Sequence, residues 1–212
     1  MTNVGRYAFV RCDKLTSVDM PAVTTAGYFS FHRCFALKEI SMPNLLSTEQ
    51  AAFELTAVTS VEFPKLTGLD GRALNSNGNL KTVYLPEVTA IGANGLASTA
   101  IESLTIYRDC TLYTGALATN KALKKVDAHG KLSLIRASIF NNTPLEALIL
   151  RSSNISTFSH VDALSGSSIA NGTGYIYVPM ALVDSYKSAT NWSNFASQIR
   201  AIEDYPEICG GE

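Results

Sequence analysis

A repeat of 21 or 22 residues runs through this chain and constrains its fold more than any other feature. The clearest copy spans residues 80–100, with apolar residues at positions 80, 83, 85, 88, 91 and 96. The same pattern begins again at Leu15, Leu37, Val58, Ile101, Leu123 and Leu145, and a degenerate copy begins near Thr173 after a step of 28 residues. A fixed period of this length predicts a solenoid, in which each coil packs only against its neighbours.

Each repeat opens with a predicted β-strand. In residues 80–86, Val83 and Leu85 alternate with Thr82 and Tyr84, which is the period-two pattern of a strand with one buried face. We expect an α/β-type, mostly β solenoid, a right-handed superhelix whose parallel sheet takes one strand from each coil. Prolines should end the strands because they cannot donate to a ladder; they are Pro21, Pro43, Pro64, Pro86 and Pro179.

The second half of each repeat places a small residue before a large one, as in Ala52-Phe53 and Gly95-Leu96. We interpret this half as a short helical or irregular turn that sends one bulky side chain into the core. Three residues after the bulky one, the chain carries Cys34, Thr56, Asn77, Thr99, Asn120 and Asn142. A stacked row of such small, mostly polar side chains can satisfy the backbone groups of the turns without a ligand.

The pattern LxxVxLPxVxxIGxxxLxxT resembles the BspA-like leucine-rich repeats of bacterial surface proteins, and the resemblance covers about residues 4–206. The segment from Tyr177 to Ala196 also resembles the closing segment of such proteins. The resemblance implies a non-enzymatic, extracellular protein engaged in adhesion or protein recognition, and it supplies no catalytic residues. The chain departs from the pattern where Asp109 and Lys131 replace the apolar residue of Val88, and where Tyr107, His129 and Arg151 replace the proline. We expect those coils to be locally less regular.

Three segments follow from this pattern. Residues 1–174 form the solenoid, with about seven full repeats after a partial first one; residues 175–206 form a final strand and a helical cap; residues 207–212 form a frayed tail. Pro179 suits the first turn of a helix that runs to about Thr190. Residues 4–12 match the second half of a repeat, so we expect either a piece cut from a longer protein or an exposed first turn.

The composition excludes several classes of function. The formal net charge is −1, which gives no field to attract nucleic acid or an anionic membrane. No apolar run reaches 18 residues, so we expect no membrane insertion. The first ten residues lack the basic and apolar regions of a signal peptide. Charged residues make up only 17% of the chain, which favours a Ser-, Thr- and Asn-rich surface and an extracellular or cell-surface location.

The sequence contains no motif of a catalytic or cofactor site. A glycine-rich phosphate loop, HExxH and GxSxG are all missing, and the three histidines fall in different repeats. We therefore expect no enzyme activity and no cofactor. Cys12 and Cys34 occupy the same repeat position, so we expect stacked, reduced thiols without metal; a disulfide and a zinc site are the alternatives.

Recognition surfaces of solenoids lie on extended faces, so the outward strand positions are the candidates for binding. The early positions are small or acidic, whereas the later ones are larger and include aromatic residues. The predicted binding residues are Tyr84, Asp127, His129, Ile149, Arg151, Tyr175 and Tyr177. The alternative is that the insertion in residues 151–174 or the C-terminal helix covers these positions.

The function that we infer from these features is recognition or adhesion without catalysis. The partner is a protein or a host or cell-surface ligand of unknown identity, bound through the exposed face of the sheet. The alternative is a structural spacer or tip segment of a larger surface or phage-tail assembly.

Overall fold

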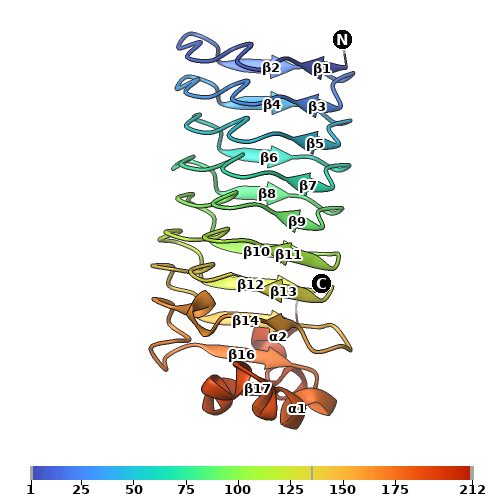
Figure 1. Ribbon diagram of the computed structural model, residues 1–212, viewed down its shortest axis with the longest axis vertical. Coiled ribbons are helices and arrows are strands. Elements are labelled where there is room, and N and C mark those ends of the chain that lie inside the picture. The colour runs from blue at the N-terminus through green and yellow to red at the C-terminus, as the bar shows by residue number, and fades with distance from the viewer. Residues whose placement is uncertain (1, 135, 211–212) are drawn as a thin grey trace.

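The repeats stack as the coils of a single solenoid in the computed structural model, which describes residues 2–134 and 136–210 (Figure 1). The N-terminus lies at one end of the stack, and the helices of the C-terminal segment lie at the other. Coils contact one another through parallel strands whose partners are 21–24 residues away along most of the stack. The predicted solenoid is therefore confirmed.

The first strand of each coil lies where the alternation predicted it. These strands are β2 (Ser17–Asp19), β4 (Glu39–Ser41), β6 (Ser60–Glu62), β8 (Thr82–Tyr84), β10 (Ser103–Ile106), β12 (Lys125–Ala128), β14 (Ala147–Leu150) and β16 (Tyr175–Val178). In β8, Thr82 and Tyr84 are exposed, whereas Val83 packs against the core between them. The predicted inward and outward positions are thus confirmed. These strands pair in three groups, β2-β4, β6-β8 and β10-β12-β14-β16, and β17 (Ile199–Ala201) joins the last group; all of them lie on one face of the solenoid, which we call the first sheet.

Each coil also carries a second, shorter strand, which the sequence pattern did not predict. These are β1 (Asn3–Val4), β3 (Thr25–Ala26), β5 (Ser47–Thr48), β7 (Gly68–Leu69), β9 (Ala90–Ile91), β11 (Cys110–Leu112), β13 (Leu132–Leu134) and β15 (Thr157–Phe158). They pair in sequence order into one eight-stranded parallel sheet, which we call the second sheet. Two or three residues are too few to show a period-two pattern, so this sheet leaves little trace in the sequence.

The coils that lack the strand-ending proline are more regular than expected, not less. The strands β10, β12 and β14 contain four residues each, whereas β4, β6 and β8 contain three. The reason is the restored backbone donor: the N–H of His129 donates to the carbonyl of Ile106, and the N–H of Arg151 donates to that of Ala128, both at 2.8 Å. At these two positions, replacing proline therefore adds one backbone hydrogen bond between neighbouring coils, although β16 also reaches four residues with Pro179 directly after it.

The core is a continuous column between the two sheets and the turns. Leu85, Ile91 and Leu96 are fully or almost fully buried, as predicted. At the N-terminal end of the column, the rings of Phe9, Phe31 and Phe53 stack with centroid separations of 5.0 and 5.4 Å. Aromatic side chains in register thus bury the interfaces between the first coils.

A turn with two left-handed residues closes most coils. In one coil these are Ala51 (φ 55°) and Leu55 (φ 58°), and in the next they are Arg72 (φ 59°) and Ser76 (φ 58°). Non-glycine residues pay a steric cost for this conformation. The same turns donate to the next coil, for example from the Ala51 N–H to the Gly71 carbonyl at 2.9 Å. Inter-coil hydrogen bonds therefore stabilise the strained turns.

The predicted row of small polar side chains lies buried beside these turns. The Asn77 side chain accepts from the Thr56 N–H at 2.7 Å and donates to the carbonyls of Phe53 and Leu74. Asn120 repeats this arrangement two coils later with Thr99. One member was assigned wrongly: Asn142 is exposed with φ 57°, and the buried position belongs to the next residue, Thr143.

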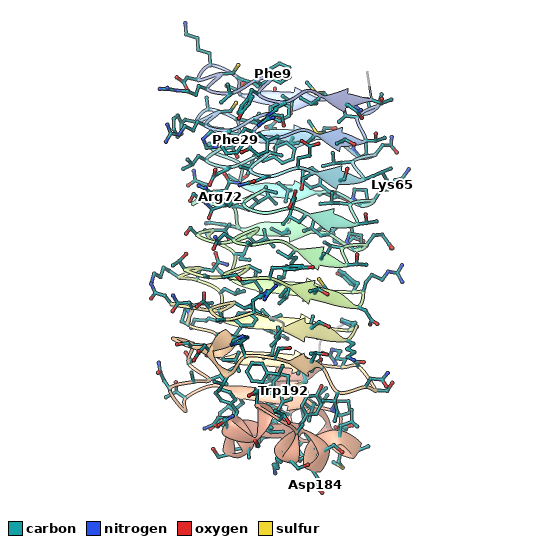
Figure 2. All side chains as sticks on the ribbon, in the orientation of Figure 1. Phe9, Phe29, Lys65, Arg72, Asp184 and Trp192 are labelled. Atoms are coloured by element: carbon teal, nitrogen blue, oxygen red, sulfur yellow. The ribbon has the colours of Figure 1, made fainter. Side chains whose placement is uncertain are left out.

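The C-terminal cap begins where the helix was expected. After η1 (Val161–Leu164) and β16, Pro179 precedes η2 (Met180–Leu182) and α1 (Val183–Ser188), followed by η3 (Trp192–Gln198) and β17 (Ile199–Ala201). Tyr186 and Trp192 are buried against the last coils, and Figure 2 places Trp192 between the stack and the cap helices. β17 adds a final strand to the first sheet beside β16. The open end of the core is thereby covered.

The expectation of a frayed tail is wrong for the residues that the structure describes. Residues 202–210 contain η4 (Ile202–Asp204) and α2 (Pro206–Cys209) and fold back over the first sheet (Figure 1). Tyr205, Ile208 and the buried Cys209 pack against Ile149 and Tyr177 there. We call residues 202–210 the C-terminal strap. Residues 211 and 212 of the predicted tail lie outside the described residues.

Candidate functional site

The C-terminal strap decides which of the predicted binding residues face solvent. Ile149 and Tyr177 are buried beneath it, so the expectation that they are exposed is wrong. Tyr175 is partly buried, and the guanidinium of Arg200 lies 4.7 Å from its ring centroid. The alternative of a covered patch therefore holds for the C-terminal part of the first sheet.

Asp127 and Arg151 face each other under the edge of the strap. The Arg151 guanidinium donates to both carboxylate oxygens of Asp127, at 2.7 and 2.8 Å, and also to the carbonyl of Cys209. The hydrogen bonds to Asp127 raise the pKa of Arg151, although burial opposes this effect. Lys125 adds a donor to the carbonyl of Ile208 at 2.8 Å. These charged groups hold the strap rather than facing solvent as free binding groups.

Tyr84 and His129 remain exposed, and Tyr107 connects them. Tyr84 is 41% exposed and Tyr107 is 42% exposed. Their ring centroids lie 6.1 Å apart in an edge-to-face arrangement, and the Tyr107 ring stacks on His129 at 5.8 Å. We call these three residues the aromatic row. Tyr107 was not among the predicted binding residues, although it was noted as a residue that replaces a strand-ending proline.

A hollow of about 500 Å³ lies beside the aromatic row on the first sheet. Its floor is formed by Ser103 and Thr105, the small outward residues of β10. Larger side chains of the next coil and of the strand ends form its walls; they are Tyr107, Lys125, Asp127 and His129. Volume and lining suit the docking of a side chain or a short segment of a partner.

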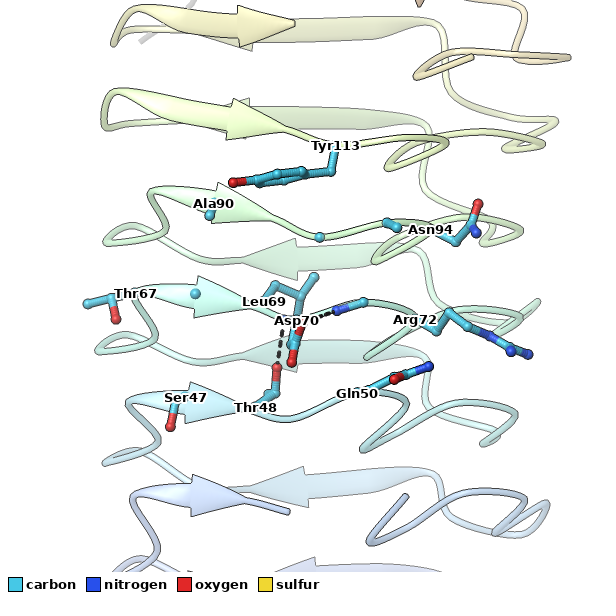
Figure 3. Close-up of a pocket in the computed structure, with 14 residues that line it drawn as sticks. Ser47, Thr48, Gln50, Thr67, Leu69, Asp70, Arg72, Ala90, Asn94 and Tyr113 are labelled. Carbon is cyan, nitrogen blue, oxygen red and sulfur yellow. Dashed lines mark hydrogen bonds between the residues drawn. The ribbon is translucent and has the colours of Figure 1, made fainter. Parts of the chain in front are cut away.

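A second concave site lies on the opposite face and was not anticipated. It is a groove of about 630 Å³ across the second sheet (Figure 3). Glycine and alanine line its floor at Gly68, Ala90 and Gly92, and Tyr113 lies at one side. In the sequence, the groove is indicated only by small residues at these repeat positions. They can be interpreted as a groove only when the second sheet is known.

A buried acidic residue on the turn side was also missed. The side chain of Glu54 is 1% exposed and accepts from Arg72 at 2.7 Å and from the Asn75 amide at 2.6 Å. Its other oxygen lies 3.1 Å from Nδ1 of His32, but neither of these two buried atoms has a hydrogen-bond partner among the described residues. Burial lowers the pKa of His32. This cluster links three consecutive coils, so we assign it a structural role.

The thiols are buried or partly buried within the coils. Cys12 and Cys34 are free in adjacent coils, and the Cys34 thiol donates to the Phe9 carbonyl at 3.0 Å. Burial raises the pKa of Cys34, and it raises the pKa of Cys110 to about 12. Thiols with raised pKa values are weak nucleophiles at neutral pH.

The arrangement of the described side chains and helices bears on metal binding and on membranes. Residues 2–134 and 136–210 contain no group of three or more His, Cys, Asp or Glu side chains placed to hold a metal ion. Over the same described residues, the helices are too short and too polar for any of them to cross a bilayer.

Comparison with known families now explains the repeat. Six copies of the BspA type leucine rich repeat region match residues 2–112 and 49–169. The chain belongs to this family. The family's repeat accounts for the solenoid, and the predicted resemblance is confirmed. A search of curated proteins finds no match to the sequence.

A solved structure supports the same fold. A leucine-rich repeat protein from Bacteroides ovatus ATCC 8483 superposes with a TM-score of 0.51 and 18% identity, over 85% of this chain and 48% of that one. A leucine rich cell surface protein from Faecalibacterium prausnitzii A2-165 gives a TM-score of 0.49 and 19% identity, over 84% of this chain and 59% of that one. This chain therefore spans about half the length of the first of these proteins.

Proposed function

We propose that this chain is a non-catalytic recognition module of a bacterial surface protein, and that it binds a protein partner through the first sheet. The observation that carries the proposal is the exposed aromatic row of Tyr84, Tyr107 and His129 beside a hollow of about 500 Å³. Membership of the BspA-type repeat family supports both the surface location and the absence of catalysis. The partner's identity stays open.

The chemistry of the surrounding face suits a protein partner that carries apolar and basic side chains. Tyrosine rings bury a large area at a small loss of rotamer freedom, which is why recognition surfaces favour them. On the N-terminal side of the aromatic row, the coils present the exposed carboxylates of Asp19, Glu39 and Glu62 in succession. A partner with lysine or arginine opposite these rungs would associate faster at low ionic strength.

The proposed binding surface contains a different set of residues from the surface predicted from the sequence. It keeps Tyr84 and His129 and adds Tyr107, whereas Ile149 and Tyr177 lie under the C-terminal strap. The surface therefore moves towards the middle of the stack.

A panel of extracellular-matrix and bacterial surface proteins, screened by biolayer interferometry, tests the proposal. For any binder, Tyr84→Ala combined with Tyr107→Ala should weaken the affinity by about 30-fold or more, equivalent to ~2 kcal/mol. Tyr113→Ala is the matched control, because Tyr113 is similarly exposed but lies on the second sheet. Equal losses in both variants would show that the first sheet is not the binding face. A panel without any binder would favour the structural spacer instead.

A further inference from the structure

We propose that the groove on the second sheet is a separate binding site for a neutral oligosaccharide, seated against Tyr113. The groove crosses β5, β7 and β9 and reaches the end of β11, so four consecutive coils contribute to it. Its volume of about 630 Å³ lies within the range of ligand-binding clefts. It lies on a different sheet from the aromatic row, and this site is independent of the protein-binding face.

The groove lies where neighbouring rungs of the second sheet carry little or no side chain, and a Cβ atom at Gly68 would meet only open space. Gly92 aligns between Asp70 on one neighbouring coil and Tyr113 on the other, since Leu69 pairs with Ile91 and Ile91 pairs with Leu112. A Cβ atom at Gly92 would lie 2.6 Å from the backbone nitrogen of Gly71. Packing between coils therefore excludes any side chain there, and the two coils approach each other closely at this rung.

The floor of the groove is flat for a related reason. Gly68 and Ala90 occupy the outward position of β7 and β9, where the neighbouring coils carry the larger Ser47 and Thr111. Two consecutive rungs next to Gly92 thus carry only a hydrogen atom and a methyl group at their outward positions. A flat sugar ring needs a floor of this kind, because bulky outward residues would lift it away from the sheet.

The walls supply the two kinds of contact that a sugar requires. Tyr113 is 38% exposed, and Figure 3 shows its ring extending along β9 towards Ala90, so an aromatic face can pack against sugar C–H groups. Asp70 accepts from the Gly71 N–H with one oxygen at 2.6 Å and can accept a sugar hydroxyl with the other. Exposed amides of Gln50 and Asn94 offer both donors and acceptors at the same groove.

Charge and backbone pairing favour this ligand over the alternatives. Among the described residues that line the groove, Arg72 is the one cation, and it is bound to the buried Glu54. Asp70 leaves a negative group facing the ligand, so an anion is disfavoured. An extended peptide would need an unpaired strand edge to add to the sheet. The strands β5, β7, β9 and β11 are already paired with one another in sequence order, so no edge is offered at the groove.

The test is a microarray of neutral oligosaccharides, followed by titration calorimetry with gluco-, manno-, galacto- and N-acetylglucosamine tetrasaccharides. We expect binding of at least one of them with a dissociation constant of millimolar order. Tyr113→Ala should weaken it by about tenfold, whereas Tyr113→Phe should retain it because the ring face remains. Ala90→Tyr should abolish binding by filling the floor, and its outward strand position tolerates an aromatic residue.

Two controls make the result decisive. Tyr84→Ala removes part of the aromatic row on the first sheet and should leave oligosaccharide binding unchanged. Circular dichroism melting of each variant shows that the solenoid is intact. Absence of binding across the array, binding that survives Ala90→Tyr, or an equal loss in Tyr84→Ala would each overturn the proposal. Oligosaccharide binding that persists after the aromatic row is removed would separate this site from the protein-binding face.

Discussion

Replacing Asn77 with alanine should be among the most damaging single changes in this solenoid. Asn77 is fully buried, and its side chain makes four hydrogen bonds to the preceding coil and its own turn. It accepts from the backbone and the hydroxyl of Thr56 at 2.7 and 3.0 Å, and it donates to the carbonyls of Phe53 and Leu74 at 3.0 and 3.1 Å. Alanine removes all four contacts at once.

The expected loss in the free energy of unfolding follows from the backbone groups that lose their hydrogen-bond partner. The Thr56 N–H and the carbonyls of Phe53 and Leu74 would lose this partner inside the protein, at about 1–1.5 kcal/mol for each group. The expected loss in the free energy of unfolding is therefore roughly 3–5 kcal/mol, which is a large share of the stability of a typical domain. Asn77→Thr should cost less, because the equivalent positions of the neighbouring coils carry Thr56 and Thr99.

Urea unfolding followed by far-ultraviolet circular dichroism measures this loss by linear extrapolation. Asn79→Ala is the matched control, since Asn79 is exposed in the same turn and should change stability by no more than about 0.5 kcal/mol. A loss below about 1 kcal/mol for Asn77→Ala at an unchanged slope would refute the idea that the side-chain row stabilises the turns.

Four further predictions test the core, the turns, the buried histidine and the thiols. Leu96→Ala should lower the free energy of unfolding by about 2–5 kcal/mol in the same assay, because Leu96 is fully buried. Arg11→Gly should be more stable than Arg11→Ala by about 1 kcal/mol in urea, because residue 11 has φ 57° and glycine adopts this conformation without strain. Burial lowers the pKa of His32, so the folded state should lose stability as the pH falls below the ordinary histidine value of about 6.5; His32→Gln should flatten this dependence in urea titrations. Thiol titration of the denatured, unreduced protein should count all 4 cysteines, whereas a count of two would mean a disulfide between Cys12 and Cys34.

The solenoid could be predicted from the sequence because the same apolar and polar pattern recurs in every repeat. The alternation of Val83 and Leu85 with Thr82 and Tyr84 identifies one strand, and each further copy repeats the same inference. The second sheet could not be predicted in this way. Its strands β7 and β9 contain two residues each, and inter-coil pairing rather than local propensity makes them strands.

The binding face was harder to predict, because exposure depends on contacts far apart in the sequence. Ile149 and Tyr177 occupy outward positions, as the pattern indicated, but residues 205–209 cover them. Lys125 contacts Ile208 across 83 residues, and a local sequence pattern carries no information on such a contact. The sequence therefore predicts which side chains of a repeat point inward or outward. Only the structure shows which of the outward side chains are exposed to solvent.

One set of substitutions links these observations. Tyr107, His129 and Arg151 replace the proline that ends the earlier strands, and each stands at the end of a four-residue strand. The first two project exposed rings that extend the aromatic row, whereas Arg151 binds Asp127 and the strap. Losing the proline therefore has two effects: it adds a backbone hydrogen bond between coils at His129 and Arg151, and it permits a large side chain at the end of the strand. The last of these side chains anchors the strap, and so the same departure from the repeat supplies two rings of the proposed recognition surface and sets its C-terminal limit.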